Sequence, residues 1–142
     1  MAVKTKTVKN LAVYGSLRQG HSNHSLLDDQ EYVATVRTYL DFEMHNLGYF
    51  PGLEESDKSS LITLELYRVD PDCWLRIEAL EGYPDFYERK DITVLEEEWG
   101  VYYIKGEEYF DNRSLGAVLS GDWSLFRKPH DLKVVNEKFL PF

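Results

Sequence analysis

The alternation of apolar and polar residues predicts strands along most of the chain. Within residues 32–42, Val33, Thr35 and Arg37 fall on one face of an extended segment and their neighbours on the other. The short apolar run from Leu11 to Val13 also has the character of a strand. The pattern predicts five or six strands, and the placed segments are residues 11–14, 32–42, 61–69, 87–95 and 101–104.

Two helices are predicted between these strands. The longer one has Asp70 as its N-cap and Pro71 in its first turn, reaches Glu81 and ends at Gly82. A shorter helix is predicted near residues 22–23, where either a serine or an asparagine could cap it. Because helices do not alternate with strands, the pattern favours an α+β fold with a curved or barrel-like mixed sheet over a doubly wound nucleotide-binding fold.

Residues 46–60 are predicted to form a loop. This stretch holds Gly48, Pro51 and Gly52 together with a run of charged and hydroxyl residues. No repeat, low-complexity tract or linker interrupts the remaining sequence. We therefore expect residues 1–142 to form a single domain.

Composition narrows the classes of partner and compartment. A formal net charge of −9 argues against nucleic acid and anionic membranes, because both require a basic protein surface. No apolar run approaches the roughly 18 residues of a membrane-spanning helix. The one cysteine, Cys73, cannot form an internal disulfide. We therefore expect a cytoplasmic protein that binds neither nucleic acid nor membranes.

The most informative motif is the loop Tyr14-Gly15-Ser16-Leu17-Arg18-Gln19-Gly20, which follows the first apolar run. A strand that stops at Gly-Ser leaves backbone N–H groups without ladder partners, and such groups suit an anion or a carbonyl oxygen. The two glycines have Walker A spacing, but His21-Ser22 follows where Lys and Ser/Thr are needed, so a phosphate-binding loop is not favoured. The serine also lacks the flanking glycines of a nucleophile elbow.

The second helix places two carboxylates among apolar residues. On a helical wheel with Trp74 at the origin, Glu81 falls at about 340° and Glu78 at about 40°, both on the apolar arc. Glu81 also lies in the last turn, where the helix dipole disfavours a charged carboxylate. Burial and dipole would both raise its pKa, as a general acid or base near neutral pH requires. Either glutamate could instead reach water or pair with a cation such as Arg89.

No metal site is predicted. The four histidines are scattered at positions 21, 24, 45 and 130. His21 and His24 could share a helix face, but a third ligand is not evident near them. Cys73 is interpreted as a small core residue rather than a nucleophile.

The two motifs resemble the gamma-glutamylcyclotransferase-like proteins, a family that includes gamma-glutamylamine cyclotransferases. The loop 14–20, with Asn23-His24 after it, is similar to the signature loop of that family. Residues 77–89 are similar to its Leu-Asp-x-x-Glu-Gly-x-Pro-x-x-Tyr-x-Arg block. Further landmarks lie at 49–52, 64–67 and 121–123, so the resemblance spans residues 11–125.

The resemblance implies a small mixed or antiparallel β-barrel of five to six strands with flanking helices, and neither a metal nor a cofactor. It also implies that a small γ-glutamyl amide is converted to 5-oxoproline and a free amine, with Glu81 as the general acid/base. The substrate-binding residues implied in this way are Tyr14, Gly15, Ser16, Leu17, Tyr87 and Arg89. Among them, Arg89 would orient Glu81 or offset the charge of the substrate.

Two residues depart from the family pattern. Glu78 replaces an aspartate, and Leu64 stands where a glycine is usual, so a leucine there would narrow the pocket if that position approaches the ligand. These departures motivate an alternative function, a non-catalytic module that binds a small carboxylate in the same pocket. The chain is expected to act as a monomer or a homodimer.

Overall fold

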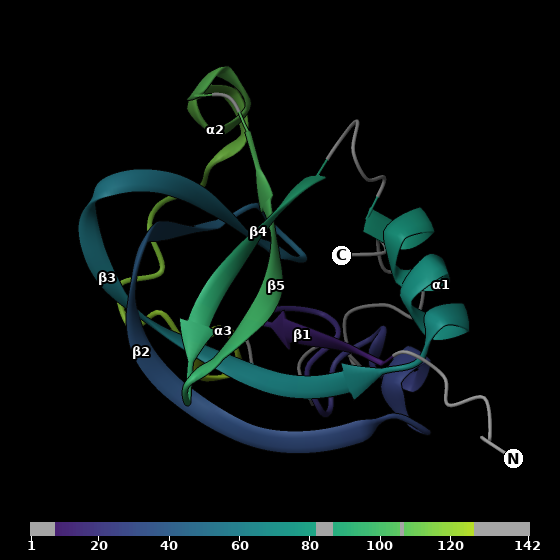
Figure 1. Cartoon of the computed structure of the whole chain (residues 1–142). Coiled ribbons are helices and arrows are strands. Elements are labelled where there is room, and N and C mark those ends of the chain that lie inside the picture. Colours follow the sequence, from purple (N-terminus) through teal and green to yellow (C-terminus); the bar gives the residue numbers. More distant parts are fainter. Residues whose placement is uncertain (1–7, 82–86, 106, 127–142) are drawn as a thin grey trace, which may run out of the picture.

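Figure 1 shows the computed structural model, which describes residues 8–81, 87–105 and 107–126. The strands are β1 (Lys9–Val13), β2 (Glu31–Asn46), β3 (Pro51–Val69), β4 (Tyr87–Val94) and β5 (Glu97–Ile104). The helices are the 3-10 helix η1 (His24–Leu27), α1 (Pro71–Glu81), α2 (Glu107–Arg113) and α3 (Trp123–Phe126). The α+β class and the number of strands are confirmed.

The sheet is mixed, as predicted, but it is not a closed barrel. Its strand order is β2-β3-β1-β5-β4, with β1 parallel to β5 and the other neighbouring pairs antiparallel. The long strands β2 and β3 bend together into a deep curve (Figure 1). Register shifts between Tyr32 and Ala34 and between Leu40 and Phe42 contribute to this bend. β2 and β4 remain as edges, so the prediction of a barrel was wrong.

The predicted loop at 46–60 was also wrong, because most of it belongs to β3. That strand begins at Pro51, which pairs with Asn46 at the end of β2. A proline is tolerated as the first residue of a strand. Gly52 does not mark a turn. A Cβ at this position would lie 2.7 Å from the Cδ1 of Leu47, so glycine allows a close approach between segments.

The longer predicted helix is confirmed as α1. The Oδ1 of Asp70 accepts a hydrogen bond of 2.8 Å from the N–H of Cys73, as an N-cap does. The predicted end at Gly82 lies outside the described residues. The shorter helix is present as η1 after Asn23, whose side chain forms no capping hydrogen bond. The Nδ2 of Asn23 instead donates to the Oγ of Ser16 at 3.0 Å, which ties η1 to the loop after β1.

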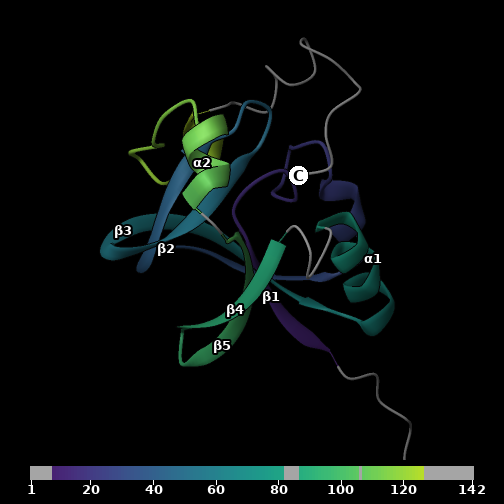
Figure 2. The ribbon, with the colours of Figure 1, turned by 90° about the horizontal axis from the view of Figure 1, so that it is seen from above.

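Two apolar clusters form the core. One contains Trp99 and Trp123, and the other contains Leu11 together with the buried face of α1, including Trp74. Leu64 is fully buried in the first cluster. In Figure 2, α1 and α2 lie well apart, with α2 beside β2. Within the described residues, no helix is long and apolar enough to cross a membrane.

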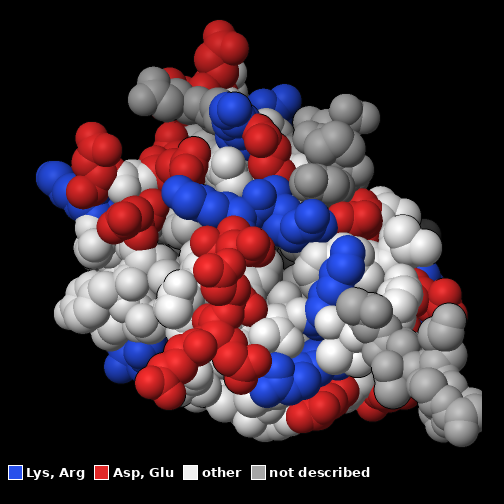
Figure 3. Space-filling model, viewed as in Figure 1, with Lys and Arg blue, Asp and Glu red and all other residues white. Residues whose placement is uncertain are grey.

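The charged surface is mixed rather than uniformly acidic. On the face shown in Figure 3, basic side chains lie next to acidic ones. Arg68 pairs with Glu97 at 2.8 Å, and Lys90 pairs with Glu55 at 3.0 Å. Pairs this exposed contribute little to stability, so the positions of the buried charges are more informative.

Candidate active site

The loop after β1 curves over the end of that strand. Its turn is closed by the N–H of Arg18, which donates to the carbonyl of Gly15 at 2.9 Å. The N–H of Asn23 donates to the carbonyl of Ser16, also at 2.9 Å. Within the described residues, no hydrogen bond from the N–H of Gly15 or of Leu17 is present. These two donors are therefore suited to a ligand anion, as the sequence predicted for this loop.

A buried ionic network fixes this loop to β3 and α3. The Nε of Arg18 donates to Glu65 at 2.9 Å, and its Nη1 donates to Asp122 at 2.7 Å. The second carboxylate oxygen of Glu65 accepts hydrogen bonds from the N–H of Gln19 and the hydroxyl of Tyr67, each at 2.9 Å. Burial acts to raise the pKa of Asp122, but the hydrogen bond and charge of Arg18 lower it. The loop is thus held by charged groups that satisfy one another.

The segment before α3 is shaped by a glycine that no other residue could replace without strain. Gly121 has a φ of +65°, and a Cβ there would lie 1.7 Å from the carbonyl oxygen of Leu61. The carbonyl of Gly121 accepts the N–H of Thr63 at 2.8 Å. This contact with β3 places the next residue, Asp122, within reach of Arg18.

Replacing Glu65 with glutamine is expected to lower the free energy of unfolding by about 2–3 kcal/mol, because Arg18 would lose the more buried of its two charge partners. The control is Glu55→Gln on the same strand. Glu55 forms an exposed pair with Lys90, so its loss should cost less than about 1 kcal/mol. Urea denaturation of the two variants measures the difference. Equal losses would show that the network does not stabilise the loop.

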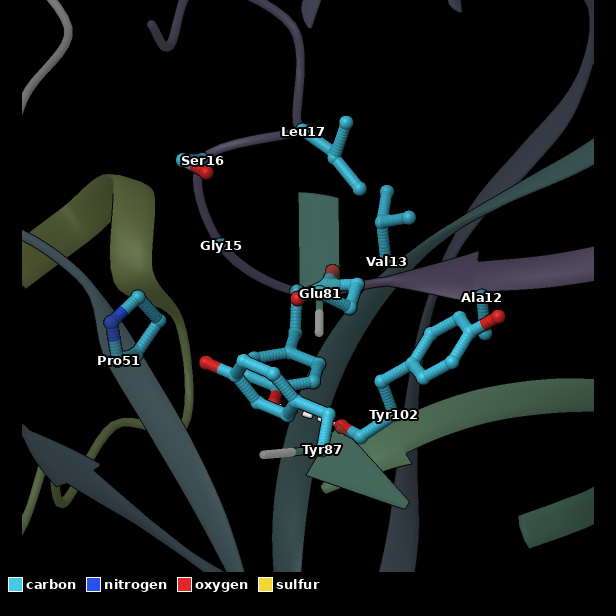
Figure 4. Close-up of a pocket in the computed structure, with 10 residues that line it drawn as sticks. Ala12, Val13, Gly15, Ser16, Leu17, Pro51, Glu81, Tyr87 and Tyr102 are labelled. Carbon is cyan, nitrogen blue, oxygen red and sulfur yellow. Dashed lines mark hydrogen bonds between the residues drawn. The ribbon is translucent and has the colours of Figure 1, made fainter. Parts of the chain in front are cut away.

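The pocket beneath the loop is lined by residues 12–17, Pro51, Glu81, Tyr87 and Tyr102. In Figure 4, Glu81 lies between Gly15 on the loop and the ring of Tyr87. The sequence predicted Tyr14, Gly15, Ser16, Leu17, Tyr87 and Glu81 for the site, and the structure places all six around this pocket. The cavity volume is about 20 Å³, which is room for about one water molecule. Leu64 is not among the lining residues, so it does not narrow the pocket as expected.

Glu81 is the buried carboxylate of the site. It is the last residue of α1 and is 8% exposed. Burial raises the pKa of its carboxyl from 4.5 to about 8. Among the described residues, no ion pair involves Glu81. The direction of the shift agrees with the prediction from the helical wheel, and the carboxyl can therefore exchange a proton near neutral pH.

Glu78, the alternative carboxylate, has a different environment. Its Oε2 accepts a hydrogen bond from the Nη1 of Arg89 and a longer one of 3.4 Å from the hydroxyl of Tyr102. The guanidinium of Arg89 also lies 5.2 Å from the ring centroid of Trp74. Arg89 therefore contacts Glu78 rather than Glu81, and it is not among the residues that line the pocket.

Tyrosines form the walls of the pocket. The hydroxyl of Tyr14 donates to the backbone carbonyl of Tyr102 at 2.8 Å. Burial, and then the proximity of Glu81, raise the pKa of Tyr14 well above its usual value. Burial likewise raises the pKa of Tyr87. Both side chains are therefore neutral phenols at physiological pH, and they shield Glu81 from bulk water.

Sequence reasoning missed Tyr102 and Pro51 as parts of the site. β1 and β5 are parallel, with Leu11 opposite Gly100. Tyr102 therefore lies opposite Val13, because each is two residues further along its strand. Pro51 reaches the pocket because β3 begins there. Only the pairing of strands distant in sequence identifies these two residues.

Comparisons with known proteins agree with this geometry. The family described as "Gamma-glutamyl cyclotransferase, AIG2-like" matches residues 11–125. A Methanocaldococcus jannaschii protein provisionally named a gamma-glutamylcyclotransferase is 34% identical over 117 residues, covering 81% of this chain and 95% of its own length. The gamma-glutamylaminecyclotransferase of Rattus norvegicus is 30% identical over 100 residues, covering 63% of this chain and 66% of its own.

Solved structures share the fold at lower identity. An uncharacterised protein from Pyrococcus horikoshii superposes with a TM-score of 0.71 at 20% identity, covering 86% of this chain and 95% of its own. An AIG2-like protein of Mus musculus gives a TM-score of 0.62 at 23% identity, covering 72% of this chain and 82% of its own. The family match spans both the loop after β1 and the helix that carries Glu81. The chain belongs to the gamma-glutamyl cyclotransferase, AIG2-like family.

Proposed function

We propose that this protein converts a small γ-glutamyl amide into 5-oxoproline and a free amine, with Glu81 as the general acid and base. The observation that carries this proposal is the buried carboxyl of Glu81, with a pKa of about 8, in a pocket beneath loop N–H groups. The substrate's α-ammonium must lose a proton and the departing amine must gain one, and a carboxyl that titrates near neutral pH can perform both transfers.

The reaction is an intramolecular acyl transfer. Glu81 as a carboxylate accepts a proton from the substrate's α-ammonium, and the resulting amine attacks the γ-carbonyl carbon of the same molecule. The new C–N bond closes a five-membered ring while the γ-carbonyl becomes an oxyanion. Glu81 then returns its proton to the departing amine as the original amide C–N bond breaks and the oxyanion becomes a carbonyl again. The ring nitrogen, which still carries a second proton, releases it to water, and 5-oxoproline results. Atoms and charges balance without a cofactor.

Geometry supplies most of the remaining rate enhancement. Ring closure within one molecule already has the high effective concentration of an intramolecular attack, so the protein has to hold one conformer of the substrate. The N–H groups of Gly15, Ser16 and Leu17 would bind the α-carboxylate and the developing oxyanion. Each well-aimed donor to an oxyanion contributes about 3 kcal/mol. Tyr14 and Tyr87 would enclose the carbon chain.

The narrow cavity implies a movement on binding. A volume of about 20 Å³ does not hold a γ-glutamyl group, so side chains at the mouth must move outward when the substrate enters. The proposed role of Arg89 is indirect. Through Glu78 it holds the strand β4 against α1, the helix that ends at Glu81.

The proposal is tested by incubating the purified protein with a panel of γ-glutamyl amines, γ-glutamyl amino acids and a γ-glutamyl isopeptide. We expect 5-oxoproline and the matching free amine in equal amounts from at least one compound, measured by chromatography. α-Glutamyl isomers serve as controls, because their geometry does not allow closure of the same ring. No release from any compound in the panel would overturn the proposal.

A second function is binding of a small carboxylate without turnover, and the N–H groups of Gly15 and Leu17, which suit an anion, favour it. Calorimetric titration with glutamate and with 5-oxoproline distinguishes the two. Saturable binding together with no product from the whole panel would identify a binding module. Product release would exclude it.

A further inference from the structure

A second cluster of potential ligands lies outside the pocket, on the hairpin formed by β2 and β3. Glu43 and His45 alternate with the buried Phe42 and Met44 on β2, so they occupy the opposite face of that strand. Glu54 of β3 pairs directly with Glu43. One ligand atom from each of the three residues lies within 4.8 Å of the others. None of the three lines the proposed active site.

A cation would stabilise the two carboxylates of this cluster. Two carboxylates directly opposite each other in an antiparallel pair repel, and such pairs are destabilising. The Nε2 of His45 lies between them, 3.0 Å from the Oε1 of Glu54 and 3.2 Å from the Oε1 of Glu43. A bound divalent metal would neutralise both carboxylates and use the lone pair of the imidazole.

The imidazole of His45 is fixed as metal-ligating rings usually are. Its Nδ1 lies 2.7 Å from the Oγ of Ser114, which can accept a hydrogen bond and so leave the Nε2 lone pair for a metal. That Oγ also accepts the N–H of Gly116 at 3.1 Å. The ring of Phe110 in α2 lies 4.6 Å from the imidazole, centroid to centroid. His45 thus has one defined orientation with Nε2 toward both glutamates.

We propose that Glu43, His45 and Glu54 form a divalent-metal site that takes Zn²⁺. One imidazole nitrogen and two carboxylate oxygens are ordinary zinc ligands. Bonds of about 2.0–2.1 Å in a tetrahedron imply ligand separations of roughly 3.3–3.4 Å, close to those around Nε2. Three protein ligands leave the fourth position to water. The side chain of Glu43 is 48% exposed, which gives the metal a path from solvent.

The position of the cluster indicates a structural role for the metal. The ladder from Glu43↔Glu54 continues through His45↔Gly52 to Asn46↔Pro51, and Pro51 lines the pocket. A metal that bridges β2 and β3 would clamp the end of the hairpin that carries this pocket wall. The site does not depend on the proposed catalytic function, because it needs neither Glu81 nor the loop after β1.

The test uses the full chain without a histidine tag, treated with EDTA and dialysed. We expect one Zn²⁺ per chain by calorimetry and a rise in Tm when Zn²⁺ is added. Co²⁺ should give visible absorption bands of a tetrahedral site. His45→Gln and Glu54→Gln should each weaken Zn²⁺ binding at least tenfold and abolish the Tm shift. Both variants are tested so that the result does not depend on one variant that fails to fold.

The control is His24→Gln, whose imidazole lies at η1 beside Asp28 rather than in the cluster. This variant should bind Zn²⁺ as the unchanged protein does. No stoichiometric binding to the unchanged protein would overturn the proposal, and so would equal binding by His45→Gln and Glu54→Gln. In either case the contact between His45 and Glu54, rather than a metal, would hold these side chains together.

Discussion

Glu81→Gln is expected to lower kcat for 5-oxoproline release by about 10²- to 10⁴-fold, the usual contribution of a positioned general acid/base. Glutamine has nearly the same shape and keeps the pocket filled, but it cannot accept the proton of the substrate's ammonium or return one to the leaving amine. KM should change little, since the loop N–H groups that would bind the substrate remain. Initial rates of 5-oxoproline formation at saturating substrate measure the effect.

Glu78→Gln is the matched control for this experiment. Glu78 lies on the same helix, three residues earlier, yet its carboxylate binds Arg89 rather than facing the pocket. We expect kcat to fall less than about tenfold, because the substitution alters no group in contact with the substrate. A larger loss in Glu78→Gln than in Glu81→Gln would mean that the roles are exchanged. Unchanged kcat in Glu81→Gln would exclude it as the acid/base.

The choice between these two glutamates shows where local sequence reasoning ends. The helical wheel put both on the apolar arc, because 340° and 40° lie only about 20° and 40° from Trp74. The two glutamates differ in their contact with Arg89, a residue of β4 that forms an ion pair with Glu78. Such a partner depends on how β4 packs against α1. From the residues alone, only the dipole argument, which uses position along the helix, favoured Glu81; the family resemblance pointed to the same residue.

The extent of β3 shows a second limit. Charged and hydroxyl residues between 54 and 60 have the composition of a loop, yet they belong to β3. Glu54, Glu55 and Ser60 pair with β2, on either side of an irregular stretch at 56–59. Tertiary pairing overrode composition, as it often does for strands. The same pairing puts Glu54 beside His45. The cluster of Glu43, His45 and Glu54 spans two strands, so it could not be predicted from the positions of the histidines alone.

The loop after β1 was the most predictable part of the site. Its function as a turn that presents N–H groups follows from a strand that stops at Gly-Ser, and the hydrogen bonds of the loop agree. The sequence did not predict the contacts that hold the loop in place. Arg18 contacts Glu65 on β3 and Asp122 before α3, which lie 47 and 104 positions further along the chain. Both contacts form only when the sheet has folded.

Glu81 is also expected to make the stability of the protein depend on pH in a way that activity measurements do not detect. Its pKa is about 8 in the folded protein and 4.5 as an ordinary glutamate. Below pH 4.5 the carboxyl is protonated in both states. Between pH 4.5 and 8 the unfolded chain releases this proton while the folded chain retains it, so the free energy of unfolding falls as pH rises.

The loss from this one group levels off above pH 8 at about 4–5 kcal/mol, from 1.36 kcal/mol per pKa unit. Urea denaturation of the unchanged protein and of Glu81→Gln, from pH 4.5 to 9, isolates this contribution because the other carboxylates are common to both. The variant should gain stability relative to the unchanged protein as pH rises to about 8, and it should keep that gain up to pH 9. Parallel curves would mean that Glu81 ionises as freely in the folded chain as in the unfolded one. A carboxyl of that kind would be hydrated and would have no raised pKa. The proposed proton transfers would then lose their physical basis, even if the pocket still bound its ligand.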